Sequence, residues 1–162
     1  MPRRPFRLGR SLTGFGLFAT RPIKKHTRLA EYKGPILDHE EAERAERRGN
    51  RYLYEITMHR TIDGTGRNNV ARYFNHSCNP NAESITWRRR VFIKTLRAIK
   101  PGEEITYDYG TDYLKYVIGR SNCKCSRCRR RRARRARELR ALKKRRAARL
   151  ARERRVKRTR RK

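Results

Sequence analysis

Residues 72–81 of the chain read RYFNHSCNPN, and the rest of the sequence is best interpreted outward from this stretch. Two further segments follow it in order, GEEITYDYG over residues 102–110 and CKCSRC over residues 123–128. Each segment alone has an ordinary explanation: a capped turn with a histidine, aromatic packing in a strand, or free thiols. Their occurrence together, in this order, predicts that they form a common site.

Length and charge limit the classes of protein that fit. The 162 residues suit one domain plus a tail, and the formal net charge is +32. Residues 129–162 contain 21 Lys and Arg against 2 acidic residues, and residues 1–128 keep 26 basic and 13 acidic side chains. We therefore expect both parts to attract polyanions or acidic surfaces.

The sequence also indicates a cellular location. No apolar run reaches the ~20 residues that span a bilayer, and no apolar signal core follows the basic N-terminus. We expect a soluble intracellular protein, cytoplasmic in a bacterium and nuclear in a eukaryote or after delivery into a host.

Short strand patterns separated by turn residues dominate the first 110 residues. A short helix is predicted over residues 38–49, where Asp38 caps the start and Gly49 ends it. Residues 70–74 suit a second short helix or turn. Alternating or β-branched patterns predict strands over residues 51–58, 83–87, 90–96 and 104–107. A turn is predicted at residues 62–66, and residues 83–96 suit a hairpin around the basic residues 88–90. The predicted fold class is mostly β with short helices, followed by a basic C-terminal tail.

The tail begins where the composition changes at Arg129. Its Arg, Ala, Lys, Leu and Glu are good helix formers, and it lacks Gly and Pro. Dense like charge at i and i+4 opposes a helix, however. We expect a tail that is disordered in isolation and helical on a polyanion, and it can serve either to bind nucleic acid or a nucleosome through phosphates or simply as a solvated extension.

The cysteines predict a metal site. Cys123, Cys125 and Cys128 lie within six residues, which is too crowded for an ordinary disulfide framework, and Cys78 is the fourth thiol. Four thiolates suit a closed, tetrahedral structural zinc site, for which the two-residue spacer before Cys128 is a standard separation. Free or redox-active thiols are the alternative.

In combination, the three segments resemble the SET-domain protein lysine methyltransferases over roughly residues 6–128. The resemblance implies small curved sheets, with the Asn-His-Ser-Cys and Tyr-Asp-Tyr segments crossing in a knot-like arrangement. It implies a SET domain over residues 6–118, a post-SET-like zinc segment over 119–130 and an Arg/Lys-rich tail, disordered or helical, over 131–162. The family usually has four residues before its last cysteine, so the loop here differs in shape.

The resemblance also implies a binding site for S-adenosylmethionine (AdoMet). Gly14-Phe15-Gly16 reads alone as an ordinary turn, but the family holds AdoMet with a Gly-x-Gly at this place. Asn75 and His76 are expected to contact the cofactor mostly through backbone groups, so His76 is neither a general base nor a metal ligand. The remaining cofactor-binding candidates are Tyr52, Arg72, Tyr73, Tyr109 and Tyr113, the last stacking on the adenine.

Methyl transfer to a lysine requires a neutral amine, although the pKa of a free lysine is ~10.4. A narrow apolar channel with phenol oxygens disfavours the ammonium by desolvation and holds the amine in line. By resemblance, Tyr109 is the catalytic tyrosine, and Tyr32 and Tyr54 line the channel. Tyr107 limits the room for further methyl groups, which predicts monomethylation with some dimethylation.

These observations indicate an AdoMet-dependent protein-lysine N-methyltransferase acting on a histone or another basic protein. Modification of its own tail is a variant of this function, because Lys143, Lys144 and Lys157 lie there. The competing interpretation is a basic, zinc-stapled nucleic-acid-binding protein with a vestigial transferase site.

Overall fold

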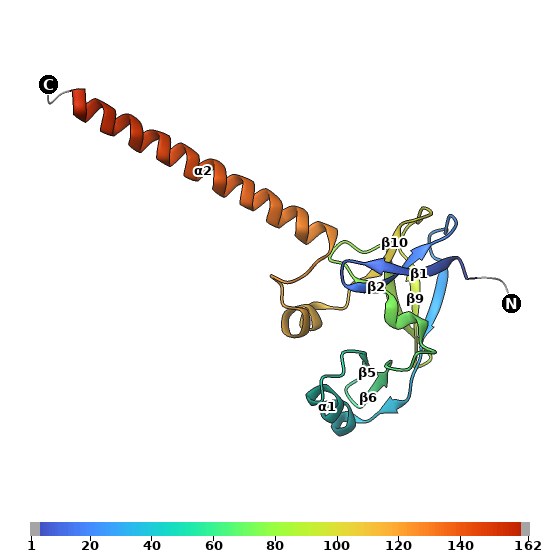
Figure 1. Cartoon of the computed structure of the whole chain (residues 1–162). Helices are drawn as coiled ribbons and strands as arrows, with labels where there is room; N and C mark the ends of the chain where they lie inside the picture. The colour runs from blue at the N-terminus through green and yellow to red at the C-terminus, as the bar shows by residue number, and fades with distance from the viewer. Residues whose placement is uncertain (1–3, 160–162) are drawn as a thin grey trace. The chain divides into compact units, whose positions relative to one another are not determined.

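The computed structural model describes residues 4–159, which fall into one compact unit ending at Cys125 and another beginning at Ser126. Short strands make up most of the first unit, joined by a few short helices (Figure 1). This unit has the predicted fold class, mostly β with short helices. The second unit is a helix.

The elements of the first unit follow the predicted pattern closely. The helix near residue 40, the hairpin around Arg88-Arg89 and the short helix after residue 69 are all present. Residues 113–118 form a π-helix that the sequence pattern did not indicate. In chain order the elements are β1 (Phe6–Ser11), β2 (Gly14–Ala19), β3 (Arg28–Tyr32), β4 (Ile36–Leu37), α1 (His39–Arg47), β5 (Leu53–Thr57), β6 (Arg60–Asp63), the 3₁₀ helix η1 (Val70–Tyr73), β7 (Asn75–His76), β8 (Ala82–Trp87), β9 (Arg90–Thr95), β10 (Glu104–Tyr107) and the π-helix η2 (Tyr113–Ile118).

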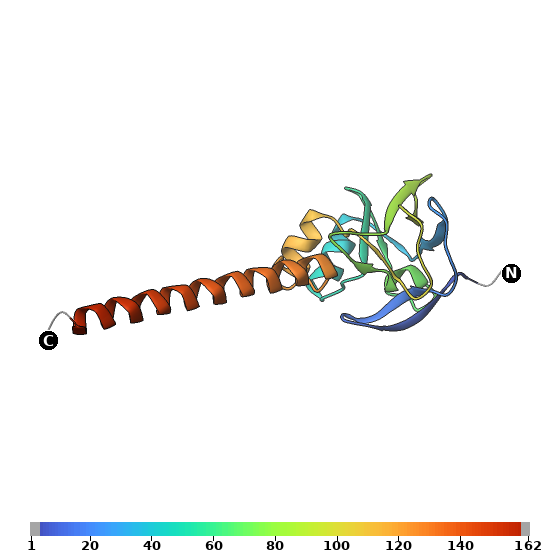
Figure 2. The same cartoon turned by 90° about the horizontal axis from the view of Figure 1, so that it is seen from above.

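The strands form three small sheets with the orders β1-β2-β10-β7, β3-β9-β8 and β4-β6-β5. The β1–β2 hairpin, blue in Figure 2, is antiparallel from Phe6 opposite Ala19 to Ser11 opposite Gly14. Strand β10 pairs antiparallel with β2 and parallel with β7. As a result, the N-terminal hairpin and the Asn-His segment lie on opposite edges of the same strand.

Residues 75–81 form hydrogen bonds to β10 through both backbone and side-chain atoms. The backbone N–H of Ser77 donates to the carbonyl of Tyr107 at 2.9 Å. Asn81 is buried, its amide donates to the Glu104 carbonyl, and its side-chain oxygen accepts from the Thr106 N–H, both at 2.8 Å. A buried amide needs such partners, and here they fix the Asn-His-Ser-Cys loop beside the Tyr-Asp-Tyr segment.

Apolar side chains from the three sheets meet in one core. Phe74, which follows η1, is 1% exposed and meets Phe6 edge-on at 5.6 Å between ring centres. Tyr32 and Tyr107 belong to the same core cluster. Because core side chains sit in close-packed, low-energy rotamers, the packing that stabilises the fold also fixes these two candidate site residues.

Helix α1 begins and ends as predicted. Asp38 accepts a hydrogen bond from the Glu41 N–H at 2.8 Å, and the Glu41 carboxylate accepts from the Asp38 N–H at 3.0 Å. This reciprocal capping box satisfies two otherwise unpaired donors. Gly49 follows the helix with a φ of +84°, a conformation that glycine adopts without steric cost.

The second unit is the helix α2 (Ser126–Thr159). Apart from Cys128, the side chains described from Ser126 to Glu153 are exposed. Pairs between Arg134 and Glu138 and between Arg149 and Glu153, each at 3.5 Å, offset a little of the repulsion. The sequence favoured disorder for this tail in isolation, and the structure has the helical alternative. No helix within residues 4–159 is long and apolar enough to cross a membrane.

Candidate active site

Five tyrosines from separate elements gather at one place in the first unit. Tyr107 ends β10, and Tyr109, two residues beyond the strand, lies with its ring centre 4.7 Å away. Tyr113 meets Tyr109 edge-on at 5.2 Å, and Tyr32 lies 5.6 Å from Tyr54. These separations are those of favourable aromatic pairs. The structure therefore brings the four predicted channel tyrosines and Tyr113 into one cluster.

Most of the tyrosine hydroxyls in this cluster donate hydrogen bonds to other groups of the protein. Tyr109 donates to the Phe74 carbonyl at 2.7 Å, which ties its ring to the residue preceding Asn75. The Tyr107 hydroxyl differs, because it has no hydrogen-bond partner among residues 4–159. The other hydroxyls donate to the Tyr52 carbonyl (Tyr32, 2.8 Å), to Ser84 Oγ (Tyr54, 2.9 Å) and to the Arg51 carbonyl (Tyr113, 2.8 Å).

Burial keeps four of these phenols protonated. It is the largest cause of the raised pKa of Tyr32, Tyr107, Tyr109 and Tyr113, and neighbouring tyrosines push each pKa further in the same direction. A phenol with a raised pKa is a neutral donor at neutral pH. The cluster therefore offers apolar ring faces and uncharged hydroxyls, a setting that disfavours an ammonium ion.

Gly16, Asn75 and Glu104 fit together tightly. The Asn75 amide donates to the Phe15 carbonyl at 2.9 Å and to Glu104 Oε1 at 2.7 Å. A Cβ at Gly16 would lie 2.4 Å from Glu104 Oε1 and 2.9 Å from Asn75 Nδ2, so a larger residue would displace these two side chains. Gly14 has a φ of +111°, which also favours glycine. The glycine pair thus allows the N-terminal hairpin to approach the Asn-His segment.

The Phe15 ring is not part of this close fit. It is 49% exposed, and the Arg10 guanidinium lies 5.0 Å from its centre. At this position it is the backbone carbonyl, and not the side chain, that contacts Asn75.

Arg72 has an unused hydrogen-bond donor. Its guanidinium carbon lies 3.9 Å from the centre of the Tyr52 ring and 5.5 Å from that of Tyr73, and one terminal nitrogen donates to the Thr65 carbonyl. Its Nε is buried without a partner within residues 4–159. A buried unpaired donor is costly, and a carboxylate, such as the one AdoMet carries, is the partner that a guanidinium prefers.

His76 connects the tyrosine cluster to the cysteines. Its Nδ1 accepts from the Tyr109 N–H at 3.2 Å, so the proton of the neutral ring is on Nε2, which lies 3.2 Å from Cys78 Sγ. Burial lowers the pKa of His76, while Asp108, 3.6 Å from Nδ1, opposes that shift. A neutral imidazole with this tautomer donates to a sulfur and orients Tyr109, and it serves as a link between two sites.

The four cysteines converge as the spacing predicted. The sulfur atoms of Cys78, Cys123, Cys125 and Cys128 all lie within 4.8 Å of one another, and none forms a disulfide. The Cys78 and Cys123 sulfurs are 3.9 Å apart, and two ligands of a tetrahedral zinc with Zn–S bonds of about 2.3 Å would be separated by about 3.8 Å. The donor set and its spacing fit zinc.

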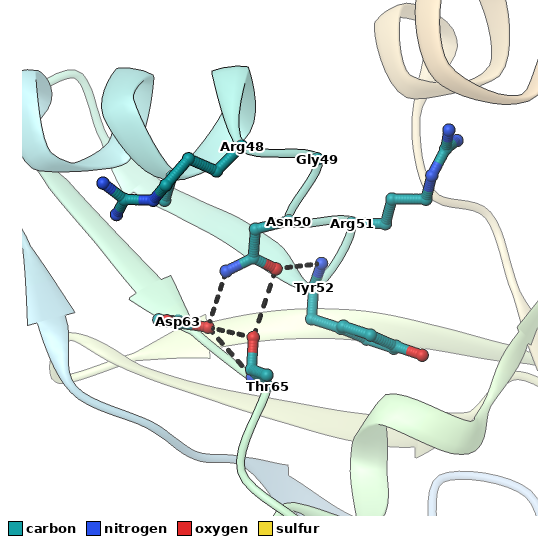
Figure 3. Close-up of a pocket in the computed structure, with 8 residues that line it drawn as sticks. Arg48, Gly49, Asn50, Arg51, Tyr52, Asp63 and Thr65 are labelled. Carbon is teal, nitrogen blue, oxygen red and sulfur yellow. Dashed lines mark hydrogen bonds between the residues drawn. The ribbon is translucent and has the colours of Figure 1, made fainter.

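A polar network that sequence reasoning missed supports Tyr52 (Figure 3). The Asn50 side chain donates to Asp63 at 2.9 Å and accepts from the Tyr52 N–H at 2.9 Å. Burial raises the pKa of Asp63, but hydrogen bonds from Thr65 and Asn50 outweigh it, so the net pKa is lowered. The network lines a cavity of about 480 Å³ beside Tyr52. Its only sequence signal was the turn pattern at residues 62–66.

Comparison with known proteins places the chain in a class. The family model described as SET domain matches residues 14–110, more than half of the chain. The chain therefore belongs to the SET-domain family, as the resemblance of its motifs predicted.

Its relatives include histone-lysine methyltransferases. The chain is 37% identical over 134 residues to histone-lysine N-methyltransferase Set2 of Drosophila melanogaster, covering 76% of this chain and 6% of that protein. It is 41% identical over 111 residues to histone-lysine N-methyltransferase 2D of Homo sapiens, covering 63% and 2%. It thus spans only a small part of these relatives.

A solved structure supports the fold. A chain of a humanized mutant of the Chaetomium thermophilum Polycomb Repressive Complex 2 has a TM-score of 0.59 and 28% sequence identity. The match covers 70% of this chain and 16% of that chain.

Proposed function

We propose that this protein is an AdoMet-dependent protein-lysine N-methyltransferase. The observation that carries the proposal is the position of Tyr109. Its hydroxyl, on a half-buried side chain, donates to the Phe74 carbonyl at 2.7 Å, and its backbone N–H donates to His76, one residue from Asn75. The proposed catalytic tyrosine and the proposed cofactor residues are therefore joined by two short hydrogen-bonded links. The SET-domain relatives that methylate histone lysines support this assignment.

Each residue of the proposed cofactor site contacts a different part of AdoMet. AdoMet, when bound, supplies a methyl group activated by a positively charged sulfur. Gly14 and Gly16 leave room for it, Arg72 offers its unpaired Nε to the carboxylate, and Asn75 and His76 hold it through their backbone. Tyr52, Tyr73 and the backbone of Phe15 flank it, and Tyr113 stacks on the adenine.

The tyrosine cluster desolvates and aligns the substrate lysine. Apolar ring faces of Tyr32, Tyr54 and Tyr109 desolvate the side chain, which lowers the pKa of the amine and favours its neutral form. The amine loses a proton to solvent before the transfer, and its lone pair is then aligned with the methyl group. The free hydroxyl of Tyr107 takes the space beside the amine, directly or through a water. We therefore propose a monomethylated product with some dimethylation.

Zinc is proposed to have a structural role. The four cysteine thiolates would bind the ion in a closed site without an open coordination position. A hydrogen bond from His76 Nε2 to Cys78 Sγ would stabilise that thiolate and orient it as a ligand. With this ion in place, residues 119–130 form a post-SET-like segment between a SET domain over residues 6–118 and a tail over 131–162.

The substrate proposed is a lysine of a histone or another basic protein, in the nucleus of a eukaryotic cell or of a host. The exposed cations of α2 would bind nucleic acid or a nucleosome through phosphates.

The test is binding and product formation in the same preparation. We expect calorimetry at moderate salt to show stoichiometric AdoMet binding, and mass spectrometry to show +14 Da, the mass of one methyl group in place of hydrogen, on a histone or on tail lysines. A protein that binds duplex DNA but neither binds AdoMet nor labels any histone would instead be the zinc-stapled nucleic-acid-binding protein.

A further inference from the structure

The hairpin that joins β8 and β9 has an unusual turn. Its two turn residues, Arg88 and Arg89, have φ values of +47° and +59°. A two-residue turn with positive φ at both positions favours Asn-Gly, because other side chains crowd the following carbonyl. The chain instead places two charged residues there at the expense of local stability. Departures of this kind are expected where a protein uses the residues for function.

The same hairpin belongs to a sheet with a basic outer face. In the register of β8, β9 and β3, Trp87 lies opposite Arg90, and Arg28 lies opposite Lys94. Residues directly opposite in a pair point to the same side of the sheet. Val91 and Ile93, at the alternate positions of β9, are fully buried. The charged positions therefore share the side facing away from the core.

Aromatic rings lie close to several of these arginines. The Arg88 guanidinium lies 4.6 Å from the Trp87 ring, and those of Arg28 and Arg90 lie 4.8 and 5.1 Å from the Phe92 ring. Phe92 is only 5% exposed although it faces outward. A guanidinium stacked on a ring keeps its N–H groups free at the edge, where they can form paired hydrogen bonds with an oxyanion.

Most of the charge on this face has no internal partner. Arg90 is neutralised by Glu31, with two hydrogen bonds of 2.7 and 2.6 Å. Arg28, Arg88, Arg89 and Lys94 form no ion pair with any residue that the structure describes, and Trp87 is 52% exposed. The basic sheet face, defined as Arg28, Trp87, Arg88, Arg89, Phe92 and Lys94, therefore presents cations without an ion-pair partner and an accessible indole, with Glu83 opposite Lys94 in the strand register.

The sheet that carries this face borders the tyrosine cluster with its opposite, inner side. Ser84, on the inner side of β8, accepts from the Tyr54 hydroxyl at 2.9 Å, and Val91 of β9 pairs with Tyr32 of β3. A cavity of about 340 Å³ is lined by Tyr32 together with Arg89 and other residues of this region. A partner held at the hairpin turn would therefore lie beside the proposed lysine channel.

We propose that the basic sheet face binds the phosphate backbone of duplex DNA. A duplex carries one phosphate charge per ~1.7 Å of its axis, so it can meet cations spread along a sheet without matching their spacing individually. An acidic peptide would need carboxylates at fixed positions. The proposal rests on the proposed function, because DNA wraps histones and so lies near a histone lysine. It concerns the first unit and is separate from the charge of α2.

The test replaces Arg88-Arg89 with Asn-Gly in the full-length protein (Arg88→Asn/Arg89→Gly). This pair removes two charges and suits the turn, so we expect Tm to rise by a few degrees. We expect the Kd for a 20-base-pair duplex, measured by fluorescence anisotropy, to increase about three- to tenfold. The slope of log Kd against log salt concentration should fall by about 2. Arg28→Gln, which leaves the turn intact, should reduce the slope by about 1.

The matched control is Arg47→Gln/Arg48→Gln, which removes two exposed charges at the end of α1. An equal loss of DNA affinity in this control would overturn the proposal, because only net charge would then matter. A larger loss for poly-glutamate than for DNA in the turn variant would assign the face to an acidic protein instead. Methyl transfer to a free histone peptide is measured alongside. If that activity is absent in wild type, the proposed function fails whether or not the face binds DNA.

Discussion

The tyrosine cluster and helix α2 use polar groups in opposite ways. In the cluster, the buried hydroxyls of Tyr109 and Tyr32 donate to single backbone carbonyls at 2.7 and 2.8 Å, and the core fixes their rings. In α2, the charged side chains described from Arg127 to Glu153 are exposed, and the ion pairs at Glu138 and Glu153 involve two of the arginines. Function in the cluster therefore depends on the positions of single atoms, whereas in the helix it depends on the number of charges.

Loss of zinc should have the largest effect on the cluster, because His76 joins the two sites. Chelation of the metal, or Cys123→Ser, should remove a binding free energy that reaches about 10–16 kcal/mol in zinc-finger peptides. We expect AdoMet affinity, followed by calorimetry, to fall about tenfold or more, and zinc added back to the chelated protein to restore it. His76→Phe should weaken zinc binding about 10–100-fold in a competition with a chromogenic chelator. Unchanged AdoMet affinity in the zinc-free protein would separate the two sites.

Gly16→Ala tests the close fit at the proposed cofactor site. The added Cβ would meet Glu104 Oε1 at 2.4 Å and disturb the Asn75 amide. We expect the Kd for AdoMet to increase about tenfold, which corresponds to ~1.4 kcal/mol.

The control for that change is Gly49→Ala. It strains a positive φ of +84° but has no atom within 4 Å of the new methyl group. Both variants should lower Tm, and only Gly16→Ala should weaken AdoMet binding. Equal cofactor affinity in the two variants would remove the glycine pair from the site.

Tyr107→Phe should change the product more than the rate. Its hydroxyl has no hydrogen-bond partner among residues 4–159, so its removal opens space without leaving a buried group unpaired. Mass spectrometry of a peptide substrate should show a shift from monomethyl- towards di- and trimethyl-lysine. Tyr113→Phe is the matched control, because its hydroxyl is committed to the Arg51 carbonyl and its loss should leave the product ratio unchanged. A Tyr107→Phe enzyme that still stops at monomethyl-lysine would contradict the proposed limit.

Deletion of residues 132–162 should have the smallest effect on chemistry. Because the deleted segment contains many of the exposed cations of α2, the affinity for duplex DNA should fall steeply and lose much of its salt dependence. The kcat for a short uncharged peptide with one lysine should stay unchanged. A proportionate loss of kcat on that peptide would show that α2 takes part in the chemistry.

Much of this site could be predicted from the sequence, for definite physical reasons. Short motifs contain most of the proposed site residues, because each has a chemical requirement that few residue types meet. Gly16 allows close approach of the backbone, Cys78 supplies a thiolate for a metal, and Asn75 and Tyr109 form hydrogen bonds. The helix at residues 38–49 was predictable because capping depends on the local pair Asp38 and Glu41.

What the sequence could not predict depends on distant backbone. The Phe74, Tyr52 and Arg51 carbonyls that accept the tyrosine hydroxyls leave no trace in residue identity. The strained φ values at Arg88 and Arg89 were likewise not apparent from a basic hairpin pattern. For α2, the high helix propensity of its residues and the repulsion between its like charges have opposite effects. The composition alone therefore did not predict whether this segment is helical or disordered.

Methyl transfer by Tyr109→Phe at saturating AdoMet tests the proposed catalytic role of Tyr109 most directly. The substitution keeps the ring and removes only the hydroxyl that donates to Phe74. Because misplacing a reacting group by about 1 Å can cost about 100-fold, we predict that kcat on a histone substrate falls about 100-fold or more, while the calorimetric Kd for AdoMet changes little. Equal kcat in wild type and Tyr109→Phe would show that the Tyr109 hydroxyl has no catalytic role.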